Sequence, residues 1–263
     1  MNMLVSERSW LLAPAIFLLS LALLFVVWSV MEPSALLAAF DAGGYSFFET
    51  LTVPFFALIV PAVWLCCPFT GSVKRRVLLC AGVTCIAVMA VVKELDLHLM
   101  LMHYLYPGLV SPDGYVQGLV KPNGTPLVGT PFKLRFIMNA GVPFGAKAVA
   151  VSYFILMFGV FAAMLAYYFP RLIKGFFRLH PVAWTMAVFG TSGVMVQVFD
   201  RLPAWYRHLH GIPKSGLSES FVALCAAFEE GGEMMIAAFA ILAILQAHAI
   251  YVGDRPPPQF AEL

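Results

Sequence analysis

The sequence is short of charged residues: Asp, Glu, Lys and Arg make up 11% of its 263 residues, whereas 61% are hydrophobic. A soluble domain has roughly 25% charged residues, so this chain cannot cover a core of its size with a water-facing surface. The composition excludes a soluble globular enzyme and a protein that binds nucleic acid through a basic face. It is typical of a polytopic membrane protein.

The sequence also lacks the short motifs of several enzyme classes. It contains no G-x-x-x-x-G-K-[ST], no G-x-S-x-G and no H-E-x-x-H. Nothing therefore indicates an NTPase with a phosphate-binding loop, a hydrolase with a nucleophile elbow or a zinc protease of the H-E-x-x-H type. The five cysteines lie in or at the ends of apolar stretches and form no Cys-x-x-Cys pair, which excludes a disulfide framework and a zinc ribbon.

Six apolar stretches are each long enough to cross a membrane, because about 20 helical residues span the roughly 30 Å of hydrocarbon in a bilayer. They lie at residues 10–31, 47–67, 77–106, 146–169, 181–199 and 220–251. We therefore expect an all-α fold, a single domain over residues 1–263 that is a bundle of six transmembrane helices. Residues 107–145 would form a loop that caps one face, and residues 252–263 a short tail.

Basic residues are concentrated in two short loops between the predicted helices. Residues 68–76 and 170–180 each contain three Lys or Arg, and short loops rich in these residues stay on the cytoplasmic side. This pattern predicts that both termini and the tail are cytoplasmic. The capping loop would then lie on the outer side.

The third predicted helix carries two pairs of an acid and a histidine. Glu94 and His98 are four residues apart, which places them on one face of a helix. Asp96 and His103 are seven apart and share another face. A charge near the bilayer centre costs about 2.5–3.5 kcal/mol on insertion, so we do not expect these side chains to face lipid unpaired.

The sixth predicted helix carries three carboxylates within about one turn, Glu229, Glu230 and Glu233. Close carboxylates repel each other at low dielectric, so they must share protons, pair with bases or bind a cation. Gly231 and Gly232 lie between them and lower the helix propensity by about 1 kcal/mol each. They would let another backbone or a ligand come close.

Other predicted helices bring ionisable residues to the same outer level. Asp200 and Arg201 end the fifth helix, and Glu49 opens the second. We therefore expect one buried polar pocket in the outer half of the bundle, with Lys93 and Arg201 as counter-charges. The acids and histidines expected to line it are Glu94, Asp96, His98, His103, Asp200, Glu229, Glu230 and Glu233.

One interpretation of this pocket is a metal-dependent enzyme that acts on a lipid-borne substrate. Carboxylate and imidazole together suit a divalent transition metal, and a carboxylate base could activate a metal-bound water. The expected metal ligands are His98, His103, Glu229 and Glu233. The carboxylates expected to be catalytic are Glu94, Asp96, Asp200, Glu229 and Glu230.

Two other interpretations stay open. In a proton- or cation-coupled transporter, the acids would form a relay, and helices one to three and four to six would be inverted repeats. In a structural or assembly subunit of a membrane complex, Lys93, Arg201 and Arg207 would neutralise the acids in an ion-pair network that fixes the helix packing.

The segment Lys93-Glu-Leu-Asp-Leu-His98 resembles a motif of a loosely defined group of uncharacterised bacterial inner-membrane proteins, which carry Arg-Glu-Leu-Asp-x-His after a transmembrane helix. Lys133-Leu-Arg135-Phe136 and the pair Glu229-Glu230 match two further features, whereas Lys93 replaces the usual Arg. The resemblance implies the bacterial inner (plasma) membrane and no known reaction. The expected partner is membrane lipid and not nucleic acid; a homo-oligomer or a complex with another membrane protein stays open.

Overall fold

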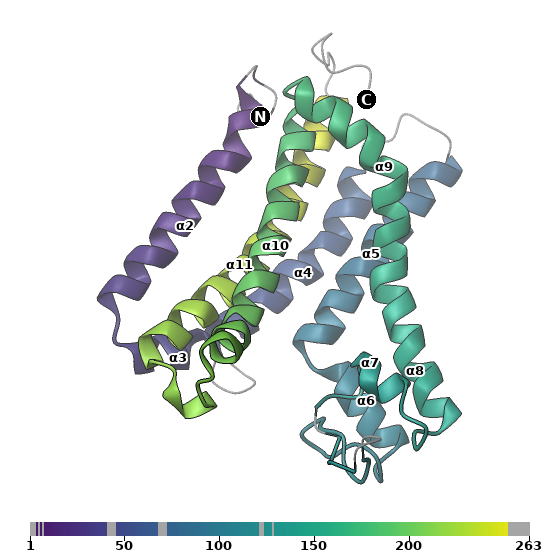
Figure 1. The fold of residues 1–263 in the computed structure, drawn as a ribbon. Helices are drawn as coiled ribbons and strands as arrows, with labels where there is room; N and C mark the ends of the chain where they lie inside the picture. The colour runs from purple at the N-terminus through teal and green to yellow at the C-terminus, as the bar shows by residue number, and fades with distance from the viewer. Residues whose placement is uncertain are drawn as a thin grey trace. The chain divides into compact units, whose positions relative to one another are not determined.

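The computed structural model describes residues 4, 6, 8–40, 46–67, 73–120, 124–127 and 129–251, without the side chains of Glu49 and Lys214. Within these ranges the chain is helical, with two isolated β-bridges, Val110–Val116 and Val120–Pro126 (Figure 1). The prediction of an all-α fold is confirmed. The predicted tail, residues 252–263, lies outside the described residues.

The helices follow the apolar stretches and the ends of the capping loop. They are a 3-10 turn η1 (Ser9–Leu11), α2 (Leu12–Val30), α3 (Pro33–Phe40), α4 (Phe47–Cys66), α5 (Val73–Glu94), α6 (Leu97–Leu105), α7 (Leu134–Ile137), α8 (Phe144–Phe154), a π-helical turn η2 (Ile155–Gly159), α9 (Val160–Phe177), α10 (Pro181–His210), a 3-10 turn η3 (Lys214–Gly216) and α11 (Glu219–Tyr251).

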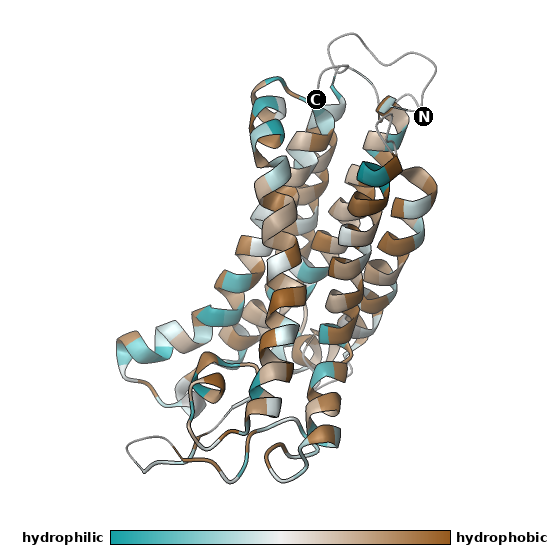
Figure 2. Ribbon diagram, turned by 90° about the vertical axis from the view of Figure 1, so that its right-hand side faces the viewer, coloured by the Kyte–Doolittle hydropathy of each residue, from teal (hydrophilic) through white to brown (hydrophobic). Residues whose placement is uncertain are grey.

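Among the described residues, five helical stretches are long and apolar enough to cross a membrane. They are Ser9–Val30, Val73–Glu94, Phe144–Phe177, Pro181–His210 and Glu219–Tyr251, and hydrophobic residues predominate along them (Figure 2). In α4 the apolar stretch Thr50–Cys66 is shorter, and Pro54 and Pro61 interrupt its hydrogen bonding. The predicted sixth crossing is therefore not confirmed.

The third predicted helix is broken, contrary to the expectation of one continuous helix over residues 77–106. α5 ends at Glu94 and α6 begins at Leu97. Between them Asp96 adopts a left-handed conformation, with φ of 50°. Asp tolerates this conformation better than most residues that have a Cβ, because its short polar side chain can bond locally. Glu94 and His98 therefore do not share a face of one helix.

The chain divides into two compact units. Unit 1 comprises Met1–Cys80 and Tyr168–Leu263, and unit 2 comprises Ala81–Tyr167. The units do not coincide with the two halves of the chain, so this division gives no support to a repeat of helices one to three in helices four to six. The single domain over residues 1–263 stays a prediction.

In unit 1, α11 is the central helix and packs against α10, α4, α3 and α2. Aromatic residues fix the helix ends. The ring centroids of Trp10 and Trp184 lie 4.9 Å apart, and the indole Nε1 of Trp28 donates a 3.1 Å hydrogen bond to the carbonyl oxygen of Ser220. α2 therefore begins beside the start of α10 and ends beside the start of α11, so α2 and α11 run in opposite directions.

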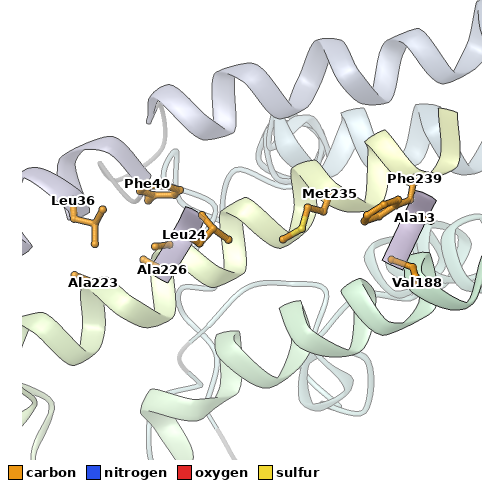
Figure 3. Close-up of a cluster of buried hydrophobic side chains, with 10 residues drawn as sticks. Ala13, Leu24, Leu36, Phe40, Val188, Ala223, Ala226, Met235 and Phe239 are labelled. Carbon is orange, nitrogen blue, oxygen red and sulfur yellow. The ribbon is translucent and has the colours of Figure 1, made fainter. Parts of the chain in front are cut away.

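The core of unit 1 follows α11, which contributes several small residues. Alanine side chains let neighbouring helices come close, and such packing drives helix association where the surroundings are as apolar as the side chains. The carboxylates of α11 lie between Ala227 and Met235, so buried core residues flank them on both sides. The buried members of this core are Ala13, Leu24, Leu36, Phe40, Val188, Ala223, Ala226, Ala227, Met235 and Phe239 (Figure 3).

Unit 2 has a core of its own, shared by α6, α7, α8 and the capping loop. Phe136 of α7 is fully buried in one cluster with Met102 of α6 and Ala146 of α8. The described part of the capping loop is thereby folded onto these helices. The other buried members of this core are Val110, Val116, Leu127 and Val142.

His180 precedes α10, outside the candidate membrane spans, and is 2% exposed. Burial lowers the pKa of its imidazole from 6.5 to about 4. Below pH 6.5 the unfolded chain binds this proton more readily than the folded protein. The folded protein therefore has its full free energy of unfolding above pH 6.5. As the pH falls from 6.5 toward 4, this free energy decreases by about 3 kcal/mol, because the unfolded chain is protonated first.

We expect this loss in thermal unfolding of the detergent-solubilised protein. Between about pH 7 and about pH 4, the melting temperature of the wild type should fall more than that of His180→Leu. The exposed His208 of α10 provides the control, because His208→Leu should follow the wild type. If all three proteins lose the same amount, His180 does not titrate as a buried group.

Candidate functional site

The first set of candidate residues lies in the middle of α11, within unit 1. Glu233 is only 9% exposed, and Glu229 and Glu230 are half-buried. A carboxylate is expensive in an apolar interior unless it is protonated, hydrogen-bonded or paired. Glu233 is therefore the most deeply buried of the three carboxylates of α11.

Gly231 and Gly232 make the packing around this set close. A Cβ at Gly232 would lie 2.6 Å from Cγ2 of Val196 and 2.9 Å from Cε of Met195, both on α10. A Cβ at Gly231 would lie 2.8 Å from the side chain of Leu24 of α2. Neither position has room for a side chain unless its neighbours move. The close approach expected at these glycines is observed for side chains of α10 and α2, which pack directly against Gly232 and Gly231.

Asp200 and Arg201 lie elsewhere in unit 1. They are exposed on α10 and form an ion pair with 2.9 Å between Nε of Arg201 and Oδ2 of Asp200. Exposed ion pairs contribute about 0–1 kcal/mol. This placement gives no support to a buried role for either residue. Of Glu49, the backbone lies in α4 and the side chain is outside the described residues.

The second set lies in unit 2, at the break between α5 and α6. Lys93 Nζ and Glu94 Oε1 form an ion pair of 2.9 Å. Asp96 is exposed and begins α6 from its left-handed position. The break thus places an ion pair at the end of α5 and a histidine, His98, in the first turn of α6.

The imidazole of His98 is held on three sides. Its Nδ1 lies 3.3 Å from the carbonyl oxygen of Val92. Its ring stacks on Tyr153, with centroids 4.9 Å apart and planes at 13°, and lies 4.8 Å from the ring of Phe132. Burial lowers the pKa of His98 below its usual value. The side chain is therefore neutral near pH 7, in one defined orientation.

His103 makes a similar contact from the other end of α6. Its Nδ1 lies 2.7 Å from the carbonyl oxygen of Val110, at the start of the capping loop. Because a carbonyl oxygen only accepts, Nδ1 of His98 and of His103 carries the hydrogen in these contacts. Nε2 then has the lone pair, and an imidazole held in this way by a backbone carbonyl is typical of a metal ligand. In this orientation His98 and His103 could each offer one nitrogen to a metal, and Glu94 of the same unit could offer a carboxylate oxygen.

Tyr153 and Phe132 were not among the residues predicted from the sequence. Their rings lie 4.7 Å apart between centroids, and Tyr153 lies just before the π-helical turn η2. Such turns within α-helices are frequent at functional sites. In the sequence Tyr153 lies in the apolar stretch 146–169 and Phe132 in the capping loop, and no local signal distinguishes either residue.

Described unit by unit, the predicted residues include one set on α11 and another at the α5–α6 break. A single pocket that contains both sets stays a prediction, and so does the resemblance carried by Lys93-Glu-Leu-Asp-Leu-His98. No protein-family model, curated protein or solved structure matches the chain.

Proposed function

We propose that this chain is a proton-coupled membrane transporter in which Glu233 binds and releases a proton within the membrane. The observation that supports it is the burial of Glu233 in the middle of α11, a helix long and apolar enough to span a bilayer. Ionisable residues inside membrane spans are costly and mark ion pathways and proton relays. The proposal does not require the inverted repeats.

The surroundings of Glu233 on α11 combine close helix packing with a second carboxylate. The space beside Gly231 and Gly232 is filled by Leu24, Met195 and Val196. Carboxylate oxygens of Glu230 and Glu233 lie within 4.8 Å of each other, and two carboxylates that share a site favour the binding of a proton. Glu229 and Glu230, on the same helix, are the groups to which the proton would pass as the site opens.

An apolar carbodiimide provides the test, because it reacts with protonated carboxyl groups in apolar surroundings. We expect mass spectrometry of the treated protein to find the adduct on Glu233, with less adduct as the pH of the reaction rises. Glu219 is the control: it is exposed in the first turn of the same helix and should stay unmodified. Equal modification of Glu219 and Glu233, or none at Glu233, would contradict the proposal.

A metal-dependent enzyme is the second candidate, and the orientation of His98 favours it. Its neutral imidazole is fixed by the carbonyl oxygen of Val92 and by stacking on Tyr153, with Nε2 as the atom that could bind a metal. Carboxylates would complete the ligand set. The substrate would be lipid-borne, since the surrounding helices are those of a membrane protein.

Elemental analysis of the purified protein tests this candidate. A metal enzyme should carry a divalent metal in stoichiometric amount, and His98→Gln should lose most of it. His208→Gln is the matched control, because His208 is exposed on α10. The same sub-stoichiometric content in all three proteins rules the metal centre out.

We further propose the bacterial inner membrane as the location, with both termini in the cytoplasm. The support is the concentration of Lys and Arg in the short loops 68–76 and 170–180. In unit 1, α2 and α11 run in opposite directions, which agrees with the first helix starting on the side where the last one ends.

A further inference from the structure

One surface of unit 2 is both strongly apolar and basic. On it Leu134 is 69%, Met138 74% and Phe144 85% exposed, and Lys133 and Arg135 are exposed as well. We call these five residues the α7 surface. Leu134 and Met138 lie one helical turn apart and Phe144 follows six residues later, and a concentration of large exposed apolar side chains of this kind usually marks a site of interaction.

The position of the α7 surface is fixed by the packing of the opposite side of α7. Phe136, on the opposite side of α7, is fully buried in the core of unit 2, and α7 packs against α8. Leu134 and Met138 are four residues apart and linked by the hydrogen bond from the Met138 amide to the Leu134 carbonyl oxygen, so they point the same way. The surface is therefore a fixed feature of the fold.

Arg135 is also positioned by its neighbours. A Cβ at Gly129 would collide with its guanidinium group, and Gly129 has φ of 129°, a conformation that favours glycine. The guanidinium therefore lies against the backbone of the capping loop at a place that only glycine leaves open.

The positive charges of this surface have no acidic partner within the described residues of unit 2. No ion pair involves Lys133 or Arg135 there, and the sequence contains no Asp or Glu between Asp113 and Asp200. An anion from outside the chain would therefore complement this surface.

The place of the surface along the chain identifies the source of that anion. Phe144 begins α8, and the candidate membrane span runs from Phe144 to Phe177. The α7 surface thus directly precedes a membrane helix, where the phosphate groups of a bilayer lie. Basic residues flanked by exposed apolar ones are typical of segments that rest at this boundary.

We propose that the α7 surface binds an anionic phospholipid of the bilayer in which the protein is embedded. Lys133 and Arg135 bind the phosphate of the head group, and Leu134, Met138 and Phe144 lie among the upper parts of the acyl chains. The site would hold lipid at the outer end of α8, independently of the proton exchange proposed for Glu233.

Native mass spectrometry of the full chain in detergent tests this site. The protein is titrated with phosphatidylglycerol and with phosphatidylcholine that has the same acyl chains. The wild type should retain more phosphatidylglycerol than phosphatidylcholine. Lys133→Gln and Arg135→Gln should each weaken this retention about fivefold, the effect of one basic residue near an anionic membrane surface, and leave phosphatidylcholine unchanged.

Two controls make the result specific. Arg201→Gln removes a positive charge that already pairs with Asp200, and it should behave as the wild type. Soluble glycerol phosphate, at the same concentration as the lipid, should not displace phosphatidylglycerol from the wild type, because the head group alone lacks the apolar contacts.

The proposal is overturned if neither Lys133→Gln nor Arg135→Gln changes the retention of phosphatidylglycerol, or if glycerol phosphate competes as well as the lipid. It is also overturned if either variant alters the number of chains in the complex while lipid retention stays the same, since the surface would then bind another protein chain. Both replaced side chains are exposed, and a folded state is verified by gel filtration.

Discussion

Glu233→Gln should abolish proton movement into lipid vesicles that contain the protein and should leave the protein folded. Glutamine keeps the size of the side chain and its hydrogen-bonding capacity, but it cannot bind or release a proton near neutral pH. The measurement is the change in fluorescence of a pH-sensitive dye trapped in the vesicles after a pH gradient is imposed. The wild type should exceed protein-free vesicles, and the variant should equal them.

Thermal unfolding of the same variant separates this function from a structural one. If Glu233 belonged mainly to a buried ion-pair network, its neutralisation would leave an opposite charge buried and cost about 3–5 kcal/mol. Proton exchange instead requires that the neutral side chain be tolerated, so Glu233→Gln should melt close to the wild type. Glu219→Gln, on the exposed first turn of α11, should retain both stability and proton movement. A variant at Glu233 that unfolds would favour the ion-pair interpretation.

Gly232→Val should strongly destabilise unit 1. Even a Cβ at this position would lie 2.6 Å from Val196, whose branched side chain has little freedom to move. Overpacking of a dense core costs typically about 1–3 kcal/mol, and we expect the upper part of this range because valine adds two methyl groups where one carbon already collides. Thermal unfolding in detergent measures the loss.

A second helical glycine provides the matched control for this variant. A Cβ at Gly190 of α10 would meet no atom within 4 Å. Gly190→Ala should therefore leave the stability unchanged or raise it by about 0.5–1 kcal/mol, through the higher helix propensity of alanine. If Gly232→Val proves as stable as Gly190→Ala, α10 and α11 are not in close contact at Gly232.

The apolar stretches could be predicted from the sequence because spanning a bilayer imposes a length and a composition that are visible residue by residue. The break at Asp96 could not, because it depends on a single backbone conformation, and the flanking leucines continue the apolar pattern on both sides. The bounds of α4, Phe47–Cys66, agree with the predicted stretch 47–67 to within one residue, but its apolar part Thr50–Cys66 is shorter than the candidate membrane spans.

The candidate residues differ in how far the sequence could place them. The three acids of α11 are recognisable, because carboxylates in an apolar helix are rare. Their unequal burial depends on which face of α11 meets α10 and α2, and that is a property of packing between distant segments. The stacking of His98 on Tyr153 also depends on packing between distant segments, and the sequence around neither residue predicts this contact.

We expect Glu233 to carry an exchangeable proton within the candidate membrane span Glu219–Tyr251 of unit 1. Infrared difference spectroscopy of the reconstituted protein, between acidic and alkaline buffer, measures this directly, because a protonated carboxyl group has a carbonyl band that its ionised form lacks. We predict one such band that disappears in Glu233→Gln and persists in Glu219→Gln. A spectrum that is the same in Glu233→Gln and in the wild type would contradict the claim.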